Sequence, residues 1–396
     1  MISDRYKDML NEKSVIRQMA EFASKRGGEI GYENVFDFSL GNPSVPTPHQ
    51  FTDACVDMLE NCEPKELHGY SQSQGIPAVR AKVAESLNRR FGMAYTAEHI
   101  FMTAGAAGAV AHALRCVTQP GDEVITFAPY FPEYGPYVNM TGDKLKVVPA
   151  DTETFQINFE HFDKMLTPSV TAVLVNSPNN PSGIVYSTST IKKLADLMNR
   201  KQAAFRHDIF LISDEPYREI IFDGTDSPYI TKYYDNSISC YSFSKALSVP
   251  GERIGYLAVN PNCTDALLIS QICAQISRGI GHNCPASLMQ LAISESLDVT
   301  ADLSVYEENM NILYDGLTEL GFQMVKPGGT FYMFPKALEE DAVRFCEKAK
   351  KYDIILVPGD SFGCPGYFRI AYCIEKEKVV RSLAAFRKFV KTEYDI

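Results

Sequence analysis

One lysine of this 396-residue chain stands among small hydroxyl residues, where it could carry covalent chemistry. Ser242 and Ser244 precede Lys245, and Arg253 follows after a Pro-Gly turn. Burial would lower the pKa of the Lys245 amine by desolvation, and the neutral amine could form a Schiff base with a carbonyl compound. Hydroxyls and a planar guanidinium are groups that bind a phosphate. Taken alone, however, Lys245 is better explained as an ordinary solvated lysine in a turn.

Two more segments put polar residues directly after apolar runs. Asn180 lies in the loop Asn176–Gly183, where its amide could hydrogen-bond a phenolate-like oxygen or a carboxylate. Asp214 ends another apolar run and could pair with a positively charged ring nitrogen, to which Tyr217 could add a hydroxyl. Each segment also has an ordinary explanation, a strand–helix turn for the first and a helix N-cap for Asp214.

The elements that must position these residues alternate between short β-rich runs and longer segments with helical spacing. Repeated alternation of this kind predicts an α/β fold with a mostly parallel sheet between helices, in three layers. Ligands bind such sheets at the carboxyl ends of the strands, where all three polar segments begin. The predicted strands are Ile100–Thr103, Glu123–Phe127, Lys144–Pro149, Thr171–Asn176, Ile209–Ser213, Ile238–Phe243 and Ile254–Val259, and clear helices are Ala106–Thr118 and Thr188–Gln202.

The last third of the chain changes character and predicts a smaller α+β domain. A helix around Ser14–Lys25 would end at Gly27-Gly28, and a long helix near residues 280–320 would join the two domains. We expect residues 1–45 and 286–396 to form the small domain and residues 46–285 to form the large one. The predicted later elements are strands at Phe322–Val325, Phe331–Phe334, Ile354–Val357 and Phe368–Cys373, and helices at Leu338–Lys351 and Glu375–Lys391.

Composition excludes several classes of partner. With 38 basic and 49 acidic side chains the formal net charge is −11, which argues against binding to nucleic acid or to anionic membranes. The length suggests two domains. No signal-peptide core and no apolar run near the roughly 20 residues of a membrane span are present. Ten scattered cysteines without a CxxC pair indicate reduced thiols and a cytoplasmic protein, and the seven histidines lack metal-ligand spacing, so we expect no metal.

Taken together, the three polar segments indicate a protein family more specifically than any one of them does. In this order and at these strand ends they resemble the fold-type I enzymes that use pyridoxal 5′-phosphate (PLP), in particular the class I/II aminotransferases. The resemblance covers about residues 37–375. The matching strings are Gly41-Asn42-Pro43, His68-Gly69-Tyr70, Asn179-Asn180-Pro181-Ser182-Gly183, Asp214-Glu215-Pro216-Tyr217, Ser242-Phe243-Ser244-Lys245, Glu252-Arg253-Ile254-Gly255-Tyr256, Pro327–Tyr332 and Phe368-Arg369-Ile370-Ala371.

The resemblance implies a role for each polar residue around the cofactor. Lys245 would hold PLP as an internal aldimine and later move the proton between substrate Cα and cofactor C4′. Asp214 would pair with the pyridine nitrogen, while Asn180 and Tyr217 would hydrogen-bond the ring's 3-oxygen. The phosphate would be bound by side chains and by backbone N–H groups at a helix start. These phosphate-binding residues are Ser242, Ser244, Arg253, Ala106 and Ala107.

Further positions follow from the same resemblance. Phe131 would stack on the pyridine ring, with its neighbour Tyr130 as the alternative. Arg369 would grip the substrate α-carboxylate as a bidentate fork, with Gly41 against the same group. Tyr70 would reach the phosphate of a neighbouring subunit, which implies a homodimer with shared active sites.

The implied activity is amino transfer between an L-amino acid and a 2-oxo acid by a ping-pong mechanism. Two alternatives are a PLP-dependent carbon–sulfur β-lyase of the same fold and a PLP-sensing regulator, which the acidic balance opposes. Just before Arg253, many relatives have an aromatic residue, whereas this chain has Glu252, as some aspartate aminotransferases do. This one match does not identify aspartate as the substrate. The second cation that a dicarboxylate substrate would need is not identifiable.

Overall fold

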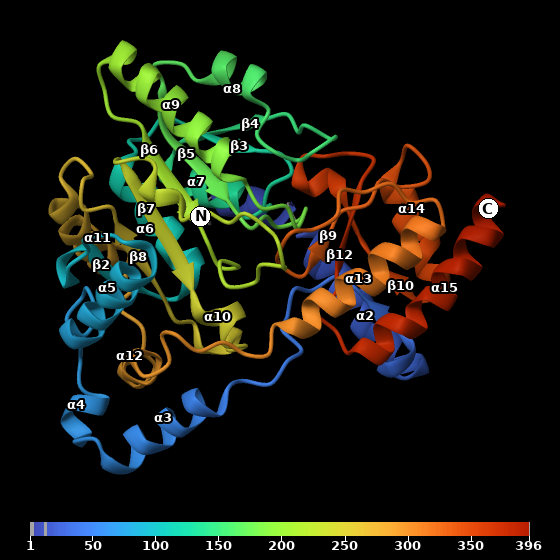
Figure 1. Cartoon of the computed structure of the whole chain (residues 1–396), viewed down its shortest axis with the longest axis horizontal. Helices are drawn as coiled ribbons and strands as arrows, with labels where there is room; N and C mark the ends of the chain where they lie inside the picture. Colours follow the sequence, from blue (N-terminus) through green and yellow to red (C-terminus); the bar gives the residue numbers. More distant parts are fainter. Residues whose placement is uncertain (1–3, 12–13, 396) are drawn as a thin grey trace.

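A seven-stranded sheet forms the centre of the computed structural model, which describes residues 4–11 and 14–395 (Figure 1). Its order is β2-β8-β7-β6-β5-β3-β4, and β8 alone runs antiparallel to its two neighbours in this sheet. The predicted α/β fold with a mostly parallel sheet is therefore confirmed. The strands are β2 Ile100–Thr103, β3 Glu123–Phe127, β4 Lys144–Val148, β5 Val170–Asn176, β6 Phe210–Asp214, β7 Ser237–Ser242 and β8 Gly255–Val259.

Both faces of this sheet are buried, which explains why its strands are almost continuously apolar. Along β5, Ala172 and Leu174 enter one core, whereas Val173 and Val175 enter the core on the opposite face. Side chains alternate between faces with a period of two, so each face requires its own helical layer. The first layer contains α6 Gly105–Val117, α7 Tyr134–Thr141 and α11 Ala266–Ile280, and the second contains α8 Phe159–Met165 and α9 Thr188–Phe205.

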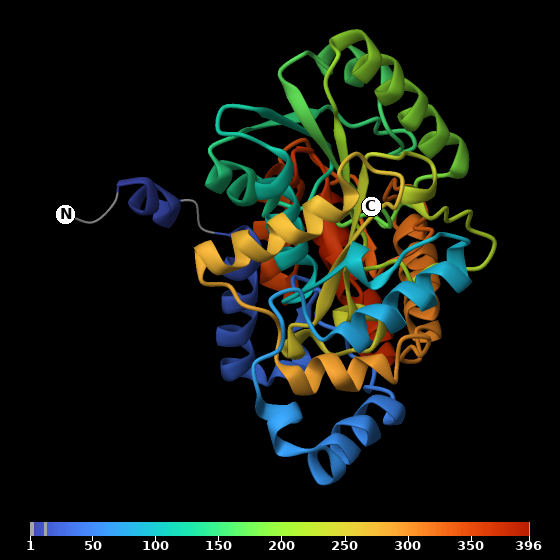
Figure 2. The ribbon, with the colours of Figure 1, turned by 90° about the vertical axis from the view of Figure 1, so that its left-hand side faces the viewer.

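A third core covers the β8 and β2 end of the sheet. It is built on α3 His49–Asn61, α5 Pro77–Phe91 and α12 Ser287–Ser294, and α3 continues into the outlying α4 Pro64–His68 (Figure 2). The one-turn helix α10 Phe243–Ala246 follows β7 directly. Short 3-10 helices occupy Tyr32–Asn34, Ala97–His99, Ile230–Lys232, Pro250–Glu252, Lys350–Tyr352 and Gly359–Phe362. Within the described ranges, every helix is too short or too polar to span a lipid bilayer.

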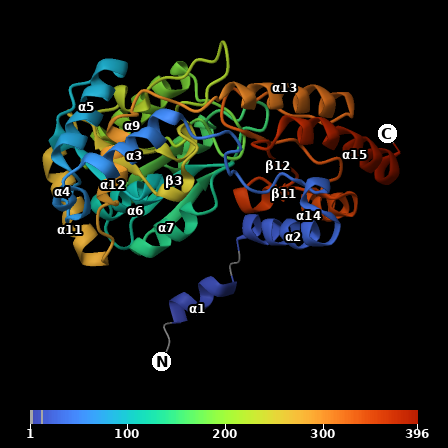
Figure 3. The ribbon, with the colours of Figure 1, turned by 90° about the horizontal axis from the view of Figure 1, so that it is seen from below.

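The beginning and the end of the chain pack together beside the large sheet (Figure 3). Strand β1 pairs in parallel with β10, and β11, β12 and β9 form an antiparallel sheet. The exact domain division at residues 45 and 285 stays a prediction. The elements of this group are α2 Val15–Ile30, β1 Phe36–Asp37, α13 Ser304–Glu319, β9 Tyr332–Met333, α14 Ala342–Ala349, β10 Ile354–Ile355, β11 Val357–Pro358, β12 Phe368–Ala371 and α15 Lys376–Tyr394, and the separate helix α1 spans Asp4–Asn11.

Two helix predictions were wrong. Helix α2 does not stop at Gly27-Gly28 but continues to Ile30 and is capped by Gly31, whose φ is +86°. Gly27 is a packing residue instead, since a Cβ there would come within 2.6 Å of the Tyr32 ring. No single helix spans 280–320, because α12 and α13 are separated by a link in which Ala301 N–H donates to Ala246 O at 2.7 Å.

Two strand predictions were also wrong. The segment Phe322–Val325 pairs with no strand of the described chain, because the Phe322 N–H bonds back to Leu317 O at the end of α13. The predicted strand Ile354–Val357 is divided: Ile354 and Ile355 pair with β1, whereas Val357 pairs with Arg369 in β12.

A buried ionic network holds the chain that follows the end of β6. The Arg218 guanidinium donates to Glu215 at 2.9 Å and to the Tyr256 hydroxyl at 2.6 Å, and it lies 4.1 Å from the Tyr241 ring centroid. The side chains of Arg218 and Glu215 are 8% and 3% exposed. Breaking such a pair leaves an uncompensated buried charge, which is much more costly than losing an exposed pair.

We predict that Arg218→Met lowers the free energy of unfolding by about 3–5 kcal/mol, because Glu215 loses its counter-ion inside the protein. Adding Glu215→Gln should restore part of that loss. The control is Lys164→Met, which breaks the exposed Lys164–Glu160 pair (67% and 75% exposed) and should cost less than about 0.5 kcal/mol. Denaturant titration measures all three variants, and equal effects of Arg218→Met and Lys164→Met would contradict the prediction.

Candidate active site

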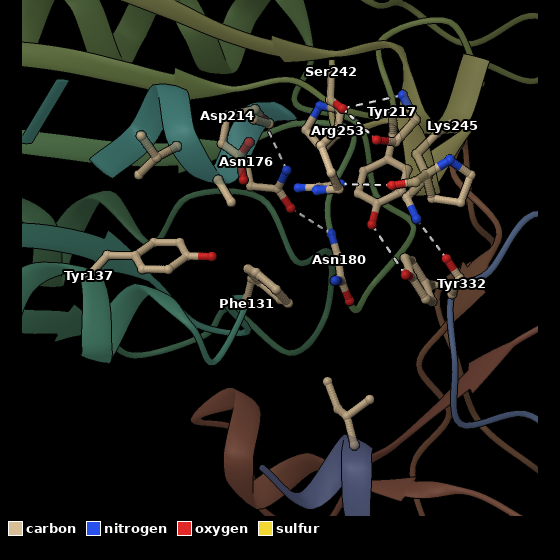
Figure 4. A pocket seen from close by; sticks show the side chains of 18 of the residues that line it. Phe131, Tyr137, Asn176, Asn180, Asp214, Tyr217, Ser242, Lys245, Arg253 and Tyr332 are labelled. Atoms are coloured by element: carbon tan, nitrogen blue, oxygen red, sulfur yellow. Dashed lines mark hydrogen bonds between the residues drawn. The ribbon is translucent and has the colours of Figure 1, made fainter. Parts of the chain in front are cut away.

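A cavity of about 240 Å³ lies where the carboxyl ends of the strands meet the smaller group of elements (Figure 4). Its lining includes every predicted site residue except Tyr70. These residues are Gly41, Ala106, Ala107, Phe131, Asn180, Asp214, Tyr217, Ser242, Ser244, Lys245, Arg253 and Arg369.

Strand register brings the polar residues together. Asn176 at the end of β5 is paired with Asp214 at the end of β6, and Asp214 is paired in turn with Cys240 in β7. Lys245 lies in α10, directly after β7. Residues separated by tens of positions in sequence therefore share one edge of the sheet, as expected for a ligand site in this fold.

The two carboxylate oxygens of Asp214 differ in their partners. Oδ2 accepts a hydrogen bond from the Tyr134 hydroxyl at 2.6 Å, whereas Oδ1 is buried and has no partner among the described residues. Burial raises the pKa of Asp214 to about 7, and the Tyr134 hydrogen bond opposes that rise. A buried oxygen without a partner is costly unless a ligand completes it, so Oδ1 is a prepared acceptor.

Lys245 is held at the opposite side of the pocket. Its Nζ donates to Gly41 O at 2.6 Å and lies 5.5 Å from the Phe331 ring centroid. Burial, with a smaller contribution from the nearby cations Arg253 and Arg369, lowers the pKa of the Lys245 amine to about 8. The amine is thus partly neutral, and nucleophilic, near physiological pH.

Hydrogen-bond donors suited to a phosphate gather at the start of α6. Gly105 begins this helix with φ +75°, and a Cβ there would lie 2.9 Å from the Arg253 guanidinium. Arg253 itself donates to two backbone carbonyls, and the Ser242 and Ser244 hydroxyls lie 2.7 Å apart beside it. A helix N-terminus, an arginine and two hydroxyls form an anion site, and glycine keeps it open.

Arg369 is a fully buried guanidinium that forms no ion pair with a carboxylate of the described residues. It donates to Asn180 Oδ1 at 3.0 Å and to Ser39 O, and its Nε has no hydrogen-bond partner in the described chain. The ring of Tyr332 supports it at 4.7 Å. Burial lowers the pKa of Arg369 from its ordinary value. A buried cation of this kind is expected to bind an anionic ligand group.

The aromatic residues are also placed by the structure. Phe131 lines the pocket, whereas Tyr130 packs instead beside Gly363. The hydroxyls of Tyr217 and Tyr332 lie 3.2 Å apart. The side chain of Tyr70 is fully exposed and outside this pocket, so its contact with a neighbouring subunit stays a prediction.

Several lining residues had no assigned role in the sequence. Tyr332 belongs to a matching segment and Asn176 to the polar loop Asn176–Gly183, so both could have been identified from the sequence. Ile16 and Tyr137 lie on separate helices and left no local signal. The complete set of these residues is Ile16, Val110, Tyr137, Asn176, Pro216, Pro250 and Tyr332.

The donor set fits PLP. The free Oδ1 of Asp214 can accept the N–H of a pyridinium ring, the open Gly105 cradle can take a phosphate, and Lys245 supplies an amine. The described residues contain no group of three or more His, Cys, Asp or Glu side chains arranged to hold a metal ion.

Comparisons with known proteins agree with this geometry. The family model for aminotransferase class I and II matches residues 33–386. Aspartate aminotransferase of Thermotoga maritima is 29% identical over 366 residues, covering 91% of this chain and 92% of that protein. Aromatic-amino-acid aminotransferase 2 of Thermococcus litoralis is 28% identical, covering 98% of each chain.

Solved structures extend the agreement to three dimensions. An amino transferase from Eubacterium rectale superimposes with a TM-score of 0.96 at 45% identity and full coverage of both chains. Aspartate aminotransferase of Thermus thermophilus with maleate gives a TM-score of 0.87 at 26% identity, covering 98% of this chain and 99% of that one. The chain therefore belongs to the class I and II aminotransferases, a family of enzymes that use pyridoxal phosphate.

Proposed function

We propose that this protein moves the amino group of an L-amino acid to a 2-oxo acid in two half-reactions of a ping-pong cycle. The observation that carries the proposal is one pocket with three complementary groups. They are the partly neutral amine of Lys245, the free carboxylate oxygen of Asp214 and the buried guanidinium of Arg369. PLP, when bound, supplies an aldehyde and an electron-withdrawing ring that stabilises the charge left when a proton leaves the substrate.

Each residue then has a task that its surroundings support. Asp214 holds the proton of the ring nitrogen, and Asn180 and Tyr217 orient the ring from its oxygen side. Arg369 binds the α-carboxylate, which aligns the substrate Cα–H with Lys245. With PLP bound, the Lys245 amine would accept that proton and would donate it at C4′.

Ser242, Ser244 and Arg253 would bind the phosphate, together with the N–H groups of Ala106 and Ala107 at the start of α6. Phe131 packs against the ring face. Gly41 lets the Tyr332 hydroxyl approach the backbone at this side of the pocket, since a Cβ there would collide with that hydroxyl.

The proposal includes a homodimer with shared active sites in the cytoplasm. Tyr70 is fully exposed, and exposed apolar side chains are present on α3 and α11, which supports burial against a second copy. They are Val56, Leu59, Leu267, Leu268 and Ile280. All ten cysteines are free thiols, which is compatible with a reducing compartment.

A panel of amino donors tests the function directly, and it should include aspartate, an aromatic amino acid and alanine, since the named relatives differ in substrate. At least one donor should convert bound PLP to pyridoxamine phosphate, with one 2-oxo acid formed per site. Conversion by none of them would contradict the proposal. Release of pyruvate and ammonia from a thioether amino acid would instead favour the β-lyase.

The variant Lys245→Ala tests the covalent attachment. We expect borohydride to fix PLP to the wild-type chain at Lys245 and not to the variant, and turnover should fall by at least about 10²-fold because the proton carrier is lost. The exposed Lys192→Ala serves as the control and should behave as wild type. Continued fixation in the Lys245→Ala protein would assign the attachment to another lysine.

The pH dependence of PLP capture tests the lowered pKa of Lys245. Only the neutral amine attacks an aldehyde, so the capture rate of the cofactor-free protein should rise with pH and level off above about 8. A simple alkylamine in the same buffers provides the reference for an ordinary amine of pKa near 10.5. A capture rate that keeps rising through pH 9 and 10, as for that reference, would be the contrary result.

A further inference from the structure

Tyr134 contacts Asp214 from outside the cofactor pocket. It is the first residue of α7, is 1% exposed, and belongs to the core between α6, α7 and the sheet. Its ring packs edge to face with Phe131, at 5.7 Å between centroids and 86° between planes. The ring is therefore fixed by packing, and its hydroxyl reaches Asp214 Oδ2 at 2.6 Å.

The direction of this hydrogen bond is set by the charges. Burial and the neighbouring Asp214 carboxylate hold the pKa of Tyr134 well above its usual value. The hydroxyl therefore stays protonated and is the donor of the hydrogen bond to Asp214. Asn176 donates to the backbone oxygen of Asp214 at 2.9 Å and leaves the carboxylate alone. With Oδ2 occupied from behind, Oδ1 is the oxygen that remains for a ligand.

The other groups around Asp214 do not provide a positive charge. Glu215, next in the chain, raises the pKa of Asp214. The Cys240 thiol on β7 and the phenols of Tyr137 and Tyr217 have pKa values raised by burial and by Asp214 itself, so all three are neutral. Among the groups that shift the pKa of Asp214, the Tyr134 hydrogen bond is the one that lowers it.

From this geometry we propose that Tyr134 is a positioning residue that keeps Asp214 ionised and aims its Oδ1 at the ring nitrogen of the cofactor. The inference rests on the proposed function, because it requires a pyridinium ligand in the pocket. The hydroxyl supplies a charge-assisted hydrogen bond, which is stronger than one between neutral groups. Because the Tyr134 hydroxyl occupies Oδ2, only Oδ1 of Asp214 is available to the ligand.

The test is Tyr134→Phe, which removes one hydroxyl, and the probe is pyridoxine 5′-phosphate. This probe lacks the aldehyde, so the ionisation of Lys245 does not enter through covalent capture. Its ring nitrogen is protonated at neutral pH and needs the Asp214 carboxylate. Affinity for the wild-type protein without cofactor should therefore fall as pH drops below about 7, where Asp214 takes up a proton.

In Tyr134→Phe the pKa of Asp214 rises, so the fall should begin about one pH unit higher, with about fivefold weaker binding at pH 7, where Asp214 of the wild type is half ionised. An analogue with carbon in place of the ring nitrogen corrects for titration of the phosphate and should bind both proteins equally. The control is Tyr234→Phe, which removes a buried hydroxyl bonded to Ile209 O at 2.7 Å, next to the other end of β6. Its pH profile should match that of the wild type.

A superimposable pH profile for Tyr134→Phe and wild type would overturn the inference while leaving the proposed function intact. Failure of the wild type to bind pyridoxine 5′-phosphate at all would overturn both. If Tyr134→Phe does not fold, Tyr134→3-fluorotyrosine keeps the ring and supplies a more acidic donor. That variant should move the fall in affinity to lower pH, and an unchanged or upward shift would again contradict the inference.

Discussion

The rest of this structure depends on two buried charged groups, Asp214 and Arg369, which have no partner of opposite charge among residues 4–11 and 14–395. Removing an ion from water costs several kcal/mol even after the protein relaxes. One carboxylate oxygen of Asp214 accepts a hydrogen bond from Tyr134, and the other has no partner among the described residues. Arg369 donates only to the Asn180 amide oxygen and to the Ser39 carbonyl in that part of the chain. A ligand that carries a ring N–H at one end and a carboxylate at the other would complete both sites, as the proposed function requires.

The fold maintains these charges by surrounding them with rigid elements. Asp214 ends a strand between two parallel neighbours, and the chain just beyond it is anchored by the Glu215–Arg218 pair. Arg369 lies on β12 of the smaller sheet, so the pocket is formed where the two groups of elements meet. The low polarity that makes the charges costly also lowers the pKa of Lys245 to about 8, which activates its amine.

The strand-end residues could be predicted from the sequence, because each polar residue directly follows an apolar run and the segments together resemble a known family. Lys245 and Asp214 are of this kind. Contacts that depend on packing between distant segments could not be predicted: Tyr134 meets Asp214 only after α7 docks on the sheet. The same limit explains Gly27, whose type suggested a helix end although it serves close contact with Tyr32. The role of Tyr70 depends on a second subunit, which one chain does not contain.

A crystal structure with PLP and an unreactive dicarboxylate analogue of the substrate would show whether Asp214 and Arg369 bind the ligand. The account predicts the ring nitrogen about 2.7–3.2 Å from Asp214 Oδ1, and a carboxylate of the analogue on the Arg369 fork at similar distances. Oδ2 should remain bonded to Tyr134. A cofactor ring bound with its nitrogen away from Asp214, or an analogue that leaves Arg369 without a carboxylate, would contradict it.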